Sequence, residues 1–164
     1  MSMKRRSLYF VSPRSVEVRE EPLAEPAPDQ VLVESICSAI SAGTEMLIYR
    51  GEFPDMPVDS HLEALSGHFA YPLCYGYSCI GRVKAIGKQV NKEWQDRLVF
   101  SFQPHCSHFL TRPETLLPIP ADLSAEAAVF LPNMETAVNL VQDAMPILGE
   151  RAIVFGQGIV GLLT

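Results

Sequence analysis

The strongest constraint on the fold of this sequence is a glycine pattern near its C-terminal end. Gly156, Gly158 and Gly161 have the spacing G-x-G-x-x-G, with a short apolar run, 152–155, directly before them and two leucines directly after. Strand, glycine turn and helix start, in this order, are what a dinucleotide-binding unit requires. Gly156 would permit the tight turn, Gly158 the close approach of a pyrophosphate, and Gly161 the close packing of helix against strand.

This pattern alone is a weak signal, because a glycine-rich turn after a buried strand would look the same. The sequence ends at Thr164, whereas a complete dinucleotide-binding domain needs several further strand–helix units. We therefore expect 151–164 to be the truncated start of such a domain, and the preceding sequence must decide between the two interpretations.

The composition is typical of a globular protein, with 48% hydrophobic and 20% charged residues among 164. The net charge of −6 argues against nucleic acid or an anionic membrane as a partner, since both attract basic patches. No apolar run approaches the roughly 20 residues of a membrane span. Four cysteines without C-x-x-C spacing indicate reduced thiols, so we expect a cytoplasmic protein.

Short β-prone segments separated by glycine and proline turns fill most of the sequence and predict a small, irregular β-barrel. These segments are 7–11, 15–20, 30–36, 80–87, 96–102, 107–111 and 116–119. The stretch 52–71 has no clear periodicity and is predicted to be a long surface loop. Two helices should follow the strands: 125–130, with Ser124 as its N-cap, and an amphipathic helix over 133–144.

The order and spacing of these segments resembles the N-terminal, GroES-like half of the medium-chain dehydrogenase/reductase superfamily. The resemblance rests on 39–51, 76–87, 96–100, 119–124, 135–137 and the terminal glycine turn. It implies an α+β fold: a GroES-like partly open β-barrel with peripheral helices, plus the first strand and glycine turn of a truncated Rossmann fold. The expected domains are a substrate domain, 1–150, and the start of the dinucleotide-binding domain, 151–164.

The sequence departs from the zinc-dependent members of this family at their metal ligands. Ala42 stands where those members carry cysteine, and Tyr77 stands where they carry histidine. Alanine offers no ligand at all, and the four-cysteine zinc loop expected near 100–106 is missing too. The chain is thus most similar to a zinc-independent branch related to the bacteriochlorophyllide-forming hydroxyethyl dehydrogenase, and no metal is expected.

Three residues are candidates for handling the substrate oxygen in place of zinc. Thr44 matches the family position whose hydroxyl lies near the reacting oxygen, although it also suits a helix N-cap. Tyr77 should face the same cleft, either as a hydrogen-bond donor or as a filling aromatic. His105 suits a substrate-contacting or acid–base role; a metal site with its neighbours is disfavoured, because adjacent strand residues point to opposite faces. Glu45 is interpreted only as a helix-start residue.

The resemblance implies an NAD(P)-dependent oxidoreductase that acts on a small carbonyl or alcohol substrate without zinc. The alternatives are a zinc-independent enone or quinone reductase, and a non-catalytic fragment that serves as a binding module. The residue that selects NAD or NADP lies about 20 residues beyond the glycine turn. We expect the isolated chain to be inactive and to bind the cofactor weakly or not at all. We also expect it to self-associate through the apolar edge of 152–155, or this segment to be disordered.

Overall fold

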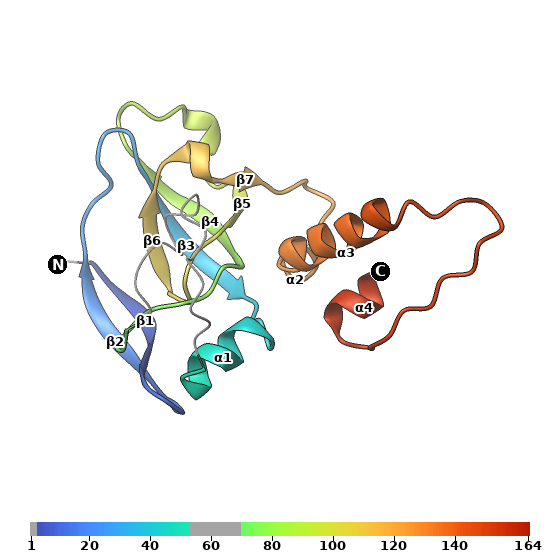
Figure 1. Cartoon of the computed structure of the whole chain (residues 1–164). Coiled ribbons are helices and arrows are strands. Elements are labelled where there is room, and N and C mark those ends of the chain that lie inside the picture. Colours follow the sequence, from blue (N-terminus) through green and yellow to red (C-terminus); the bar gives the residue numbers. More distant parts are fainter. Residues whose placement is uncertain (1–2, 53–69) are drawn as a thin grey trace. The chain divides into compact units, whose positions relative to one another are not determined.

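The computed structural model describes residues 3–52 and 70–164, so the central part of the loop predicted over 52–71 lies outside the described residues. The chain divides into two compact units, an N-terminal unit, Met1–Val129, and a C-terminal unit, Phe130–Thr164 (Figure 1). The functional boundary expected between 150 and 151 stays a prediction, because this division follows contacts alone.

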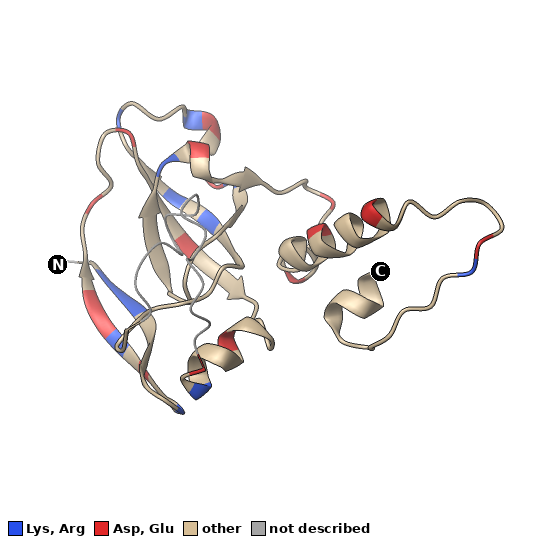
Figure 2. Ribbon diagram, in the orientation of Figure 1, with Lys and Arg blue, Asp and Glu red and all other residues tan. Residues whose placement is uncertain are grey.

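The N-terminal unit begins with the predicted hairpin, which is longer than expected. Strand β1 (Met3–Ser12) pairs antiparallel with β2 (Ser15–Leu23) across a tight turn in which Arg14 has a φ of 63°. Basic and acidic positions lie next to one another on the ribbon of this hairpin (Figure 2), and Lys4 pairs with Glu20 across the strands at 3.0 Å.

One carboxylate fixes the base of the hairpin. Glu21 accepts hydrogen bonds from the Tyr9 hydroxyl at 2.5 Å, the Ser7 hydroxyl at 2.7 Å and the Arg5 Nε at 2.9 Å. The bonds from Tyr9 and Ser7, together with Arg5, hold the pKa of Glu21 below its usual range, because they stabilise the charged form. The hairpin is therefore held by a polar network in addition to its backbone ladder.

A five-stranded antiparallel sheet forms the core of the N-terminal unit, in the order β6-β3-β4-β5-β7. Its strands are β3 (Val31–Ser38), β4 (Cys79–Ile86), β5 (Leu98–Ser101), β6 (His108–Thr111) and β7 (Leu117–Pro118). Alternating residues of these strands fill one cluster, in which Val31, Val33, Val83 and Val99 are completely buried. The period of two in the sequence produces this face, because successive strand residues point to opposite sides.

The β3–β4 pairing is irregular, with register shifts between Leu32 and Val33 and between Ser35 and Cys37. Such irregularities bend and twist a sheet. Across the described ranges, the strands form two sheets and no closed barrel. The architecture thus matches the expected partly open, GroES-like barrel.

The short helices of the N-terminal unit are α1 (Thr44–Arg50), the single 3-10 turns η2 (Lys92–Trp94) and η3 (Pro113–Thr115), and α2 (Ala125–Ala128). The predicted cap of α2 is confirmed, since the Ser124 hydroxyl accepts from the Ala127 amide at 3.2 Å. The suggested capping role of Thr44 is wrong: Gly43 occupies the cap position without a side-chain bond, and Thr44 is the first helical residue.

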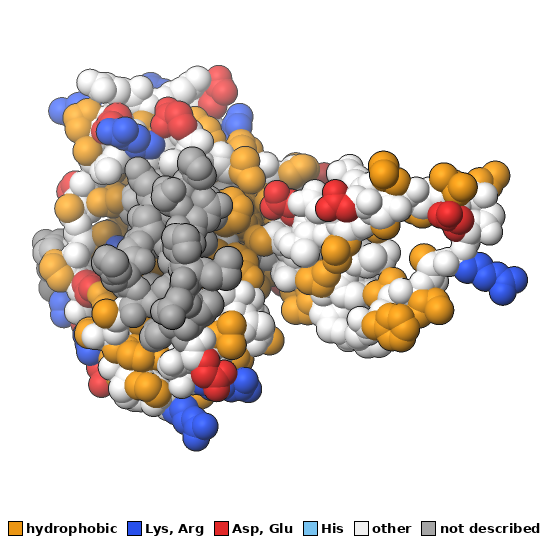
Figure 3. Space-filling view, viewed as in Figure 1, with side chains coloured by type: hydrophobic (Ala, Val, Ile, Leu, Met, Phe, Trp, Pro, Cys, Tyr) orange, Lys and Arg blue, Asp and Glu red, His pale blue; other side chains and the backbone are white. Residues whose placement is uncertain are grey.

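The C-terminal unit contains α3 (Leu131–Ala144) and α4 (Ile159–Leu163). The predicted amphipathic helix is confirmed with an earlier start, but the predicted strand over 152–155 does not form. A strand requires a partner to satisfy its backbone groups, and no described segment pairs with this one. Phe155 is 93% exposed, and apolar side chains are visible on the surface of this unit (Figure 3). No helix within 3–52 or 70–164 has the length and apolar character needed to cross a membrane.

Candidate active site

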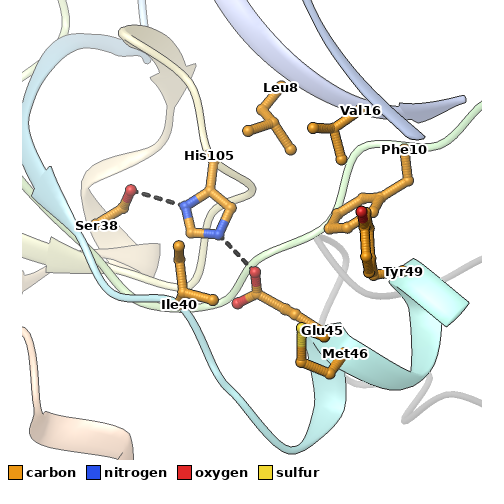
Figure 4. Close-up of a pocket in the computed structure, with 9 residues that line it drawn as sticks. All are labelled: Leu8, Phe10, Val16, Ser38, Ile40, Glu45, Met46, Tyr49 and His105. Carbon is orange, nitrogen blue, oxygen red and sulfur yellow. Dashed lines mark hydrogen bonds and ion pairs between the residues drawn. The ribbon is translucent and has the colours of Figure 1, made fainter. Parts of the chain in front are cut away.

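A pocket of about 410 Å³ lies in the N-terminal unit, between the hairpin, the end of β3, α1 and the segment before β6 (Figure 4). Its walls are mainly apolar, with three polar side chains among them. The lining residues are Leu8, Phe10, Val16, Ser38, Ile40, Glu45, Met46, Tyr49 and His105. A mostly apolar pocket with a few convergent polar groups is the usual form of a small-molecule site.

The three polar residues form one hydrogen-bonded chain. The His105 Nδ1 lies 2.7 Å from the Ser38 hydroxyl, and its Nε2 lies 2.8 Å from the Glu45 Oε2. Figure 4 shows the imidazole between the other two side chains, so that each ring nitrogen has one partner. The hydroxyl comes from the end of β3, the carboxylate from α1 and the imidazole from the segment before β6.

The carboxylate of Glu45 is almost completely buried, with 4% of the side chain exposed, and the His105 side chain is 11% exposed. Burial of a charge is costly unless hydrogen bonds compensate it. Here the Ser41 amide donates to the Glu45 Oε1 at 2.8 Å, while His105 meets the other oxygen. Glu45 also lies in the first turn of α1, where the helix dipole favours a negative charge.

The backbone fixes the position of His105 from two sides. Its amide donates to the Tyr75 carbonyl at 3.4 Å, and its carbonyl accepts from the Leu8 amide at 2.9 Å. Gly76 lies against the ring with a φ of 137°, and a Cβ there would come within 3.1 Å of the His105 Nε2. Position 76 therefore requires glycine both for its backbone conformation and for the space that the imidazole occupies.

This arrangement can carry a proton. With a neutral imidazole, the Ser38 hydroxyl donates to Nδ1 while Nε2–H donates to Glu45. If the serine oxygen takes a proton from a hydroxyl group in the pocket as its own proton passes to Nδ1, the serine stays neutral and an imidazolium forms, which the adjacent carboxylate stabilises. Ser38 is the exposed end of the array and lines the pocket, so its hydroxyl is accessible from there.

Of the three predicted site residues, only His105 lines this pocket. Thr44 is exposed at the start of α1, directly before Glu45. Tyr77 is half-buried and packs edge-on against Tyr75, with ring centroids 6.3 Å apart. Burial raises the pKa of Tyr75, and the nearby Tyr77 and Glu45 raise it further, so this phenol stays protonated at neutral pH. The roles suggested for Thr44 and Tyr77 stay predictions.

Sequence reasoning missed Ser38 and underrated Glu45. Ser38 is 67 positions from His105, and no spacing rule links a serine at a strand end to so distant a histidine. Glu45 could have been chosen as a candidate from the sequence, because it is a carboxylate that directly follows the candidate Thr44 at the start of a short helix. Its burial against an imidazole is a tertiary contact that helix-start preferences do not reveal.

The glycine turn of the C-terminal unit leads into α4, although the described residues directly before it form no strand. Gly156 has a φ of 106°, and a Cβ at Gly161 would lie 2.2 Å from the Gly156 carbonyl oxygen. Gly158 faces open space, with no heavy atom within 4 Å of a Cβ placed there, which leaves its backbone accessible. Among the residues that the structure describes, no group of three or more His, Cys, Asp or Glu side chains is arranged to hold a metal ion.

The fold of this chain is similar to that of solved dehydrogenases and reductases. No family model matches the chain. A curated relative, the 2-desacetyl-2-hydroxyethyl bacteriochlorophyllide A dehydrogenase of Cereibacter sphaeroides, is 35% identical over 81 residues, which is 49% of this chain and 22% of that protein.

Solved structures of dehydrogenases share the fold over nearly the whole chain. The 2R,3R-butanediol dehydrogenase from Bacillus subtilis has a TM-score of 0.76 at 19% identity, covering 97% of this chain and 53% of that one. A short chain alcohol dehydrogenase from E. coli CFT073, complexed with NADH, has a TM-score of 0.70 at 18% identity, covering 98% and 51%. The chain thus spans about half the length of these structures and less of the curated relative.

Proposed function

We propose that this chain is the N-terminal part of an NAD(P)-dependent oxidoreductase that acts on a small carbonyl or alcohol substrate without zinc. The observation that carries the proposal is the Ser38–His105–Glu45 chain inside an apolar pocket, within a fold shared with dehydrogenases. Reduction of a carbonyl requires a proton at the oxygen, and these side chains form a path for one.

Gly156, Gly158 and Gly161 would hold the pyrophosphate of NAD or NADP, with 1–150 acting as the substrate domain and 151–164 as the start of the dinucleotide-binding domain. When bound, the nicotinamide would supply or accept a hydride. His105 would act as acid and base, while the hydroxyls of Thr44 and Tyr77 remain proposed contacts to the substrate oxygen.

Zinc independence is part of this proposal, and it rests on Ala42 and Tyr77 at the family's ligand positions. Elemental analysis of purified, chelator-washed protein tests it. We expect no stoichiometric transition metal; a one-to-one zinc content that survives chelation would overturn this part of the proposal.

A single methyl group tests the cofactor site. Gly158→Ala should leave the turn intact, since its φ is −77° and the space beside it is open, but the methyl would block the approaching pyrophosphate. Gly43→Ala is the matched control, with a φ of −71° and open space in the N-terminal unit. Binding of NADH or NADPH is measured by saturation-transfer NMR in a longer protein that contains this chain and the rest of the dinucleotide-binding domain. We expect binding that is lost in the first variant and kept in the second, and equal signals in both variants would contradict the assignment.

Reduction of an enone or quinone is the second candidate, because the quinone oxidoreductase from Coxiella burnetii also shares the fold, with a TM-score of 0.65 at 18% identity. This likeness concerns the fold alone, whereas the buried acid–base pair favours a ketone or alcohol. Oxidation of NADH and NADPH by the protein with ketone and quinone acceptors separates the two. Because the isolated chain is expected to be inactive, the assay uses a longer protein that contains it. Turnover of quinones only, unaffected by His105→Ala, would favour the second candidate, and no turnover by that longer protein with any acceptor would favour a binding module.

We also propose that the chain self-associates, so that its partners are a small molecule and a second copy of the chain. A cytoplasmic location is proposed because all four cysteines are unpaired. Exposed apolar side chains of 152–155, among them Ile153 at 76% and Phe155 at 93%, support self-association. Light scattering after size-exclusion chromatography should show oligomers that an Ile153→Ser, Phe155→Ser double variant reduces. A strict monomer would contradict this part.

A further inference from the structure

We propose that the pocket beside His105 selects uncharged, apolar alcohols and ketones, with Ser38 as the contacting hydroxyl and Glu45 as the group that rejects anions of the same shape. This names a substrate class for the proposed oxidoreductase and in that sense rests on the proposed function. The binding itself needs no cofactor, so it can be measured separately.

The walls of the pocket determine the body of the ligand. Five of the nine lining residues are purely hydrocarbon, thioether or phenyl side chains, and Tyr49 adds a second aromatic ring. Phe10 and Tyr49 lie together at the side of the pocket away from Ser38 (Figure 4). A volume of about 410 Å³ is within the ordinary range for small-molecule sites. A ligand of one aromatic ring and a short alkyl arm would bury its apolar surface there.

The charges of the lining residues disfavour a ligand with a negative charge. No lysine or arginine is among the nine lining residues, so a carboxylate or phosphate would find no permanent cation. It would instead enter a pocket that already contains the buried carboxylate of Glu45. Desolvation and like-charge repulsion both oppose such an anion.

The polar end of the pocket can bind both members of an alcohol–ketone pair. While the Ser38 hydroxyl donates to a neutral His105, its oxygen can accept from an alcohol. When His105 carries the proton on Nδ1, that N–H donates to the serine oxygen, and the serine hydroxyl is free to donate to a ketone. Glu45 fixes the other ring nitrogen in both states, at 2.8 Å, and therefore acts as a positioning residue.

The test uses three probes of nearly equal size: 4-phenylbutan-2-ol, 4-phenylbutan-2-one and 4-phenylbutanoate. Their affinities for the full chain are measured without cofactor by saturation-transfer NMR and titration. We expect the alcohol and the ketone to bind and the carboxylate to bind at least about tenfold more weakly. Equal or stronger binding of the carboxylate would overturn the proposal.

Variants then assign the roles. Ser38→Ala removes one hydrogen bond from an exposed position and should weaken the alcohol and ketone about fivefold. Glu45→Gln keeps the size of the side chain but removes the charge, so it should restore binding of 4-phenylbutanoate about tenfold. Unchanged selectivity in a folded Glu45→Gln protein would show that Glu45 does not set it.

A third variant keeps the test decisive if Glu45→Gln does not fold. Val16→Trp places a large ring at a wall residue that is 47% exposed, and it should abolish binding of all neutral probes. Leu117→Trp on β7 is the control, because it has a matched exposure of 48% and does not line the pocket. Equal binding in both tryptophan variants would place the ligand elsewhere. Binding of the neutral probes without any effect of Gly158→Ala on NADH would leave this proposal standing and remove the proposed function.

Discussion

The five-stranded sheet and the C-terminal unit differ in how far their apolar side chains are buried. Val31, Val33 and Val99 are fully buried in the sheet, whereas Phe155 and Ile153 of the C-terminal unit are largely exposed. Burial of apolar surface is the main stabilising term in folding. The pocket therefore rests on a framework with its own core, while the glycine turn lies in a unit where little apolar surface is covered.

The largest difference in stability between the two regions is expected when an aromatic ring is removed from each. Phe109 is 2% exposed within the sheet core, so Phe109→Ala should lower the free energy of unfolding by about 3–5 kcal/mol. Phe155→Ala should change it by no more than about 0.5 kcal/mol, because the ring already contacts solvent. Urea unfolding, followed by far-UV circular dichroism, measures both, because the sheet of one unit and α3 of the other contribute to the signal. A large loss for Phe155→Ala would mean that the C-terminal unit has a core of its own.

A smaller effect is expected from the carboxylates of the two units. Glu21 makes three side-chain hydrogen bonds, so Glu21→Gln should cost about 1–2 kcal/mol at pH 7. The pKa of Glu21 is lowered in the folded state, chiefly by Tyr9 and Ser7. Its stabilisation is thus fully present above the unfolded pKa of about 4.5 and is lost as the pH falls through the lower folded pKa.

The difference between wild type and Glu21→Gln should therefore shrink in acid. Glu150→Gln is the control in the C-terminal unit, where one exposed carboxylate oxygen accepts from the Ile147 amide at 3.1 Å, and its effect should stay within about 0.5 kcal/mol. Urea titrations between pH 7 and pH 3 measure both variants. A difference for Glu21→Gln that grows in acid would contradict the assigned hydrogen bonds.

The smallest expected effect concerns helix hydroxyls. Ser124→Ala removes the cap of α2 and should cost about 1 kcal/mol. Thr136→Ala in α3 removes only a bond from the threonine hydroxyl to the Pro132 carbonyl within the same helix, and alanine has the higher helix propensity. Its effect on the thermal midpoint should be near zero or slightly positive. A larger loss for Thr136→Ala than for Ser124→Ala would reverse the comparison.

The sequence predicted those parts of the fold that depend on local rules. Strands β1 to β5 follow from β-prone segments and turns, and the cap at Ser124 follows from a preference that acts within one helical turn. The short run 152–155 had the composition of a buried strand, but a strand depends on a partner, and composition does not state whether a partner is present. The capping position near Thr44 was wrong by one residue, which is the usual uncertainty of a helix end.

The site was only partly predictable, for a related reason. His105 was found through its residue type, since imidazole is a common acid–base group. Ser38 and Glu45 join it over separations of 67 and 60 residues, so only the folded chain shows the contact. The glycine turn could be recognised in the sequence because its pattern lies within six consecutive residues, and its role in binding a dinucleotide stays a prediction.

The central claim is a division of roles, in which the N-terminal unit binds the small molecule and the glycine turn binds the dinucleotide. Two titrations of the isotope-labelled full chain, one with 4-phenylbutan-2-ol and one with NADH, test it by two-dimensional NMR. We predict that the alcohol shifts the signals of Leu8, Ile40 and Met46, and that NADH shifts those of Gly156 to Gly161. Shifts at the glycine turn with the alcohol, or at the pocket residues alone with NADH, would contradict the account.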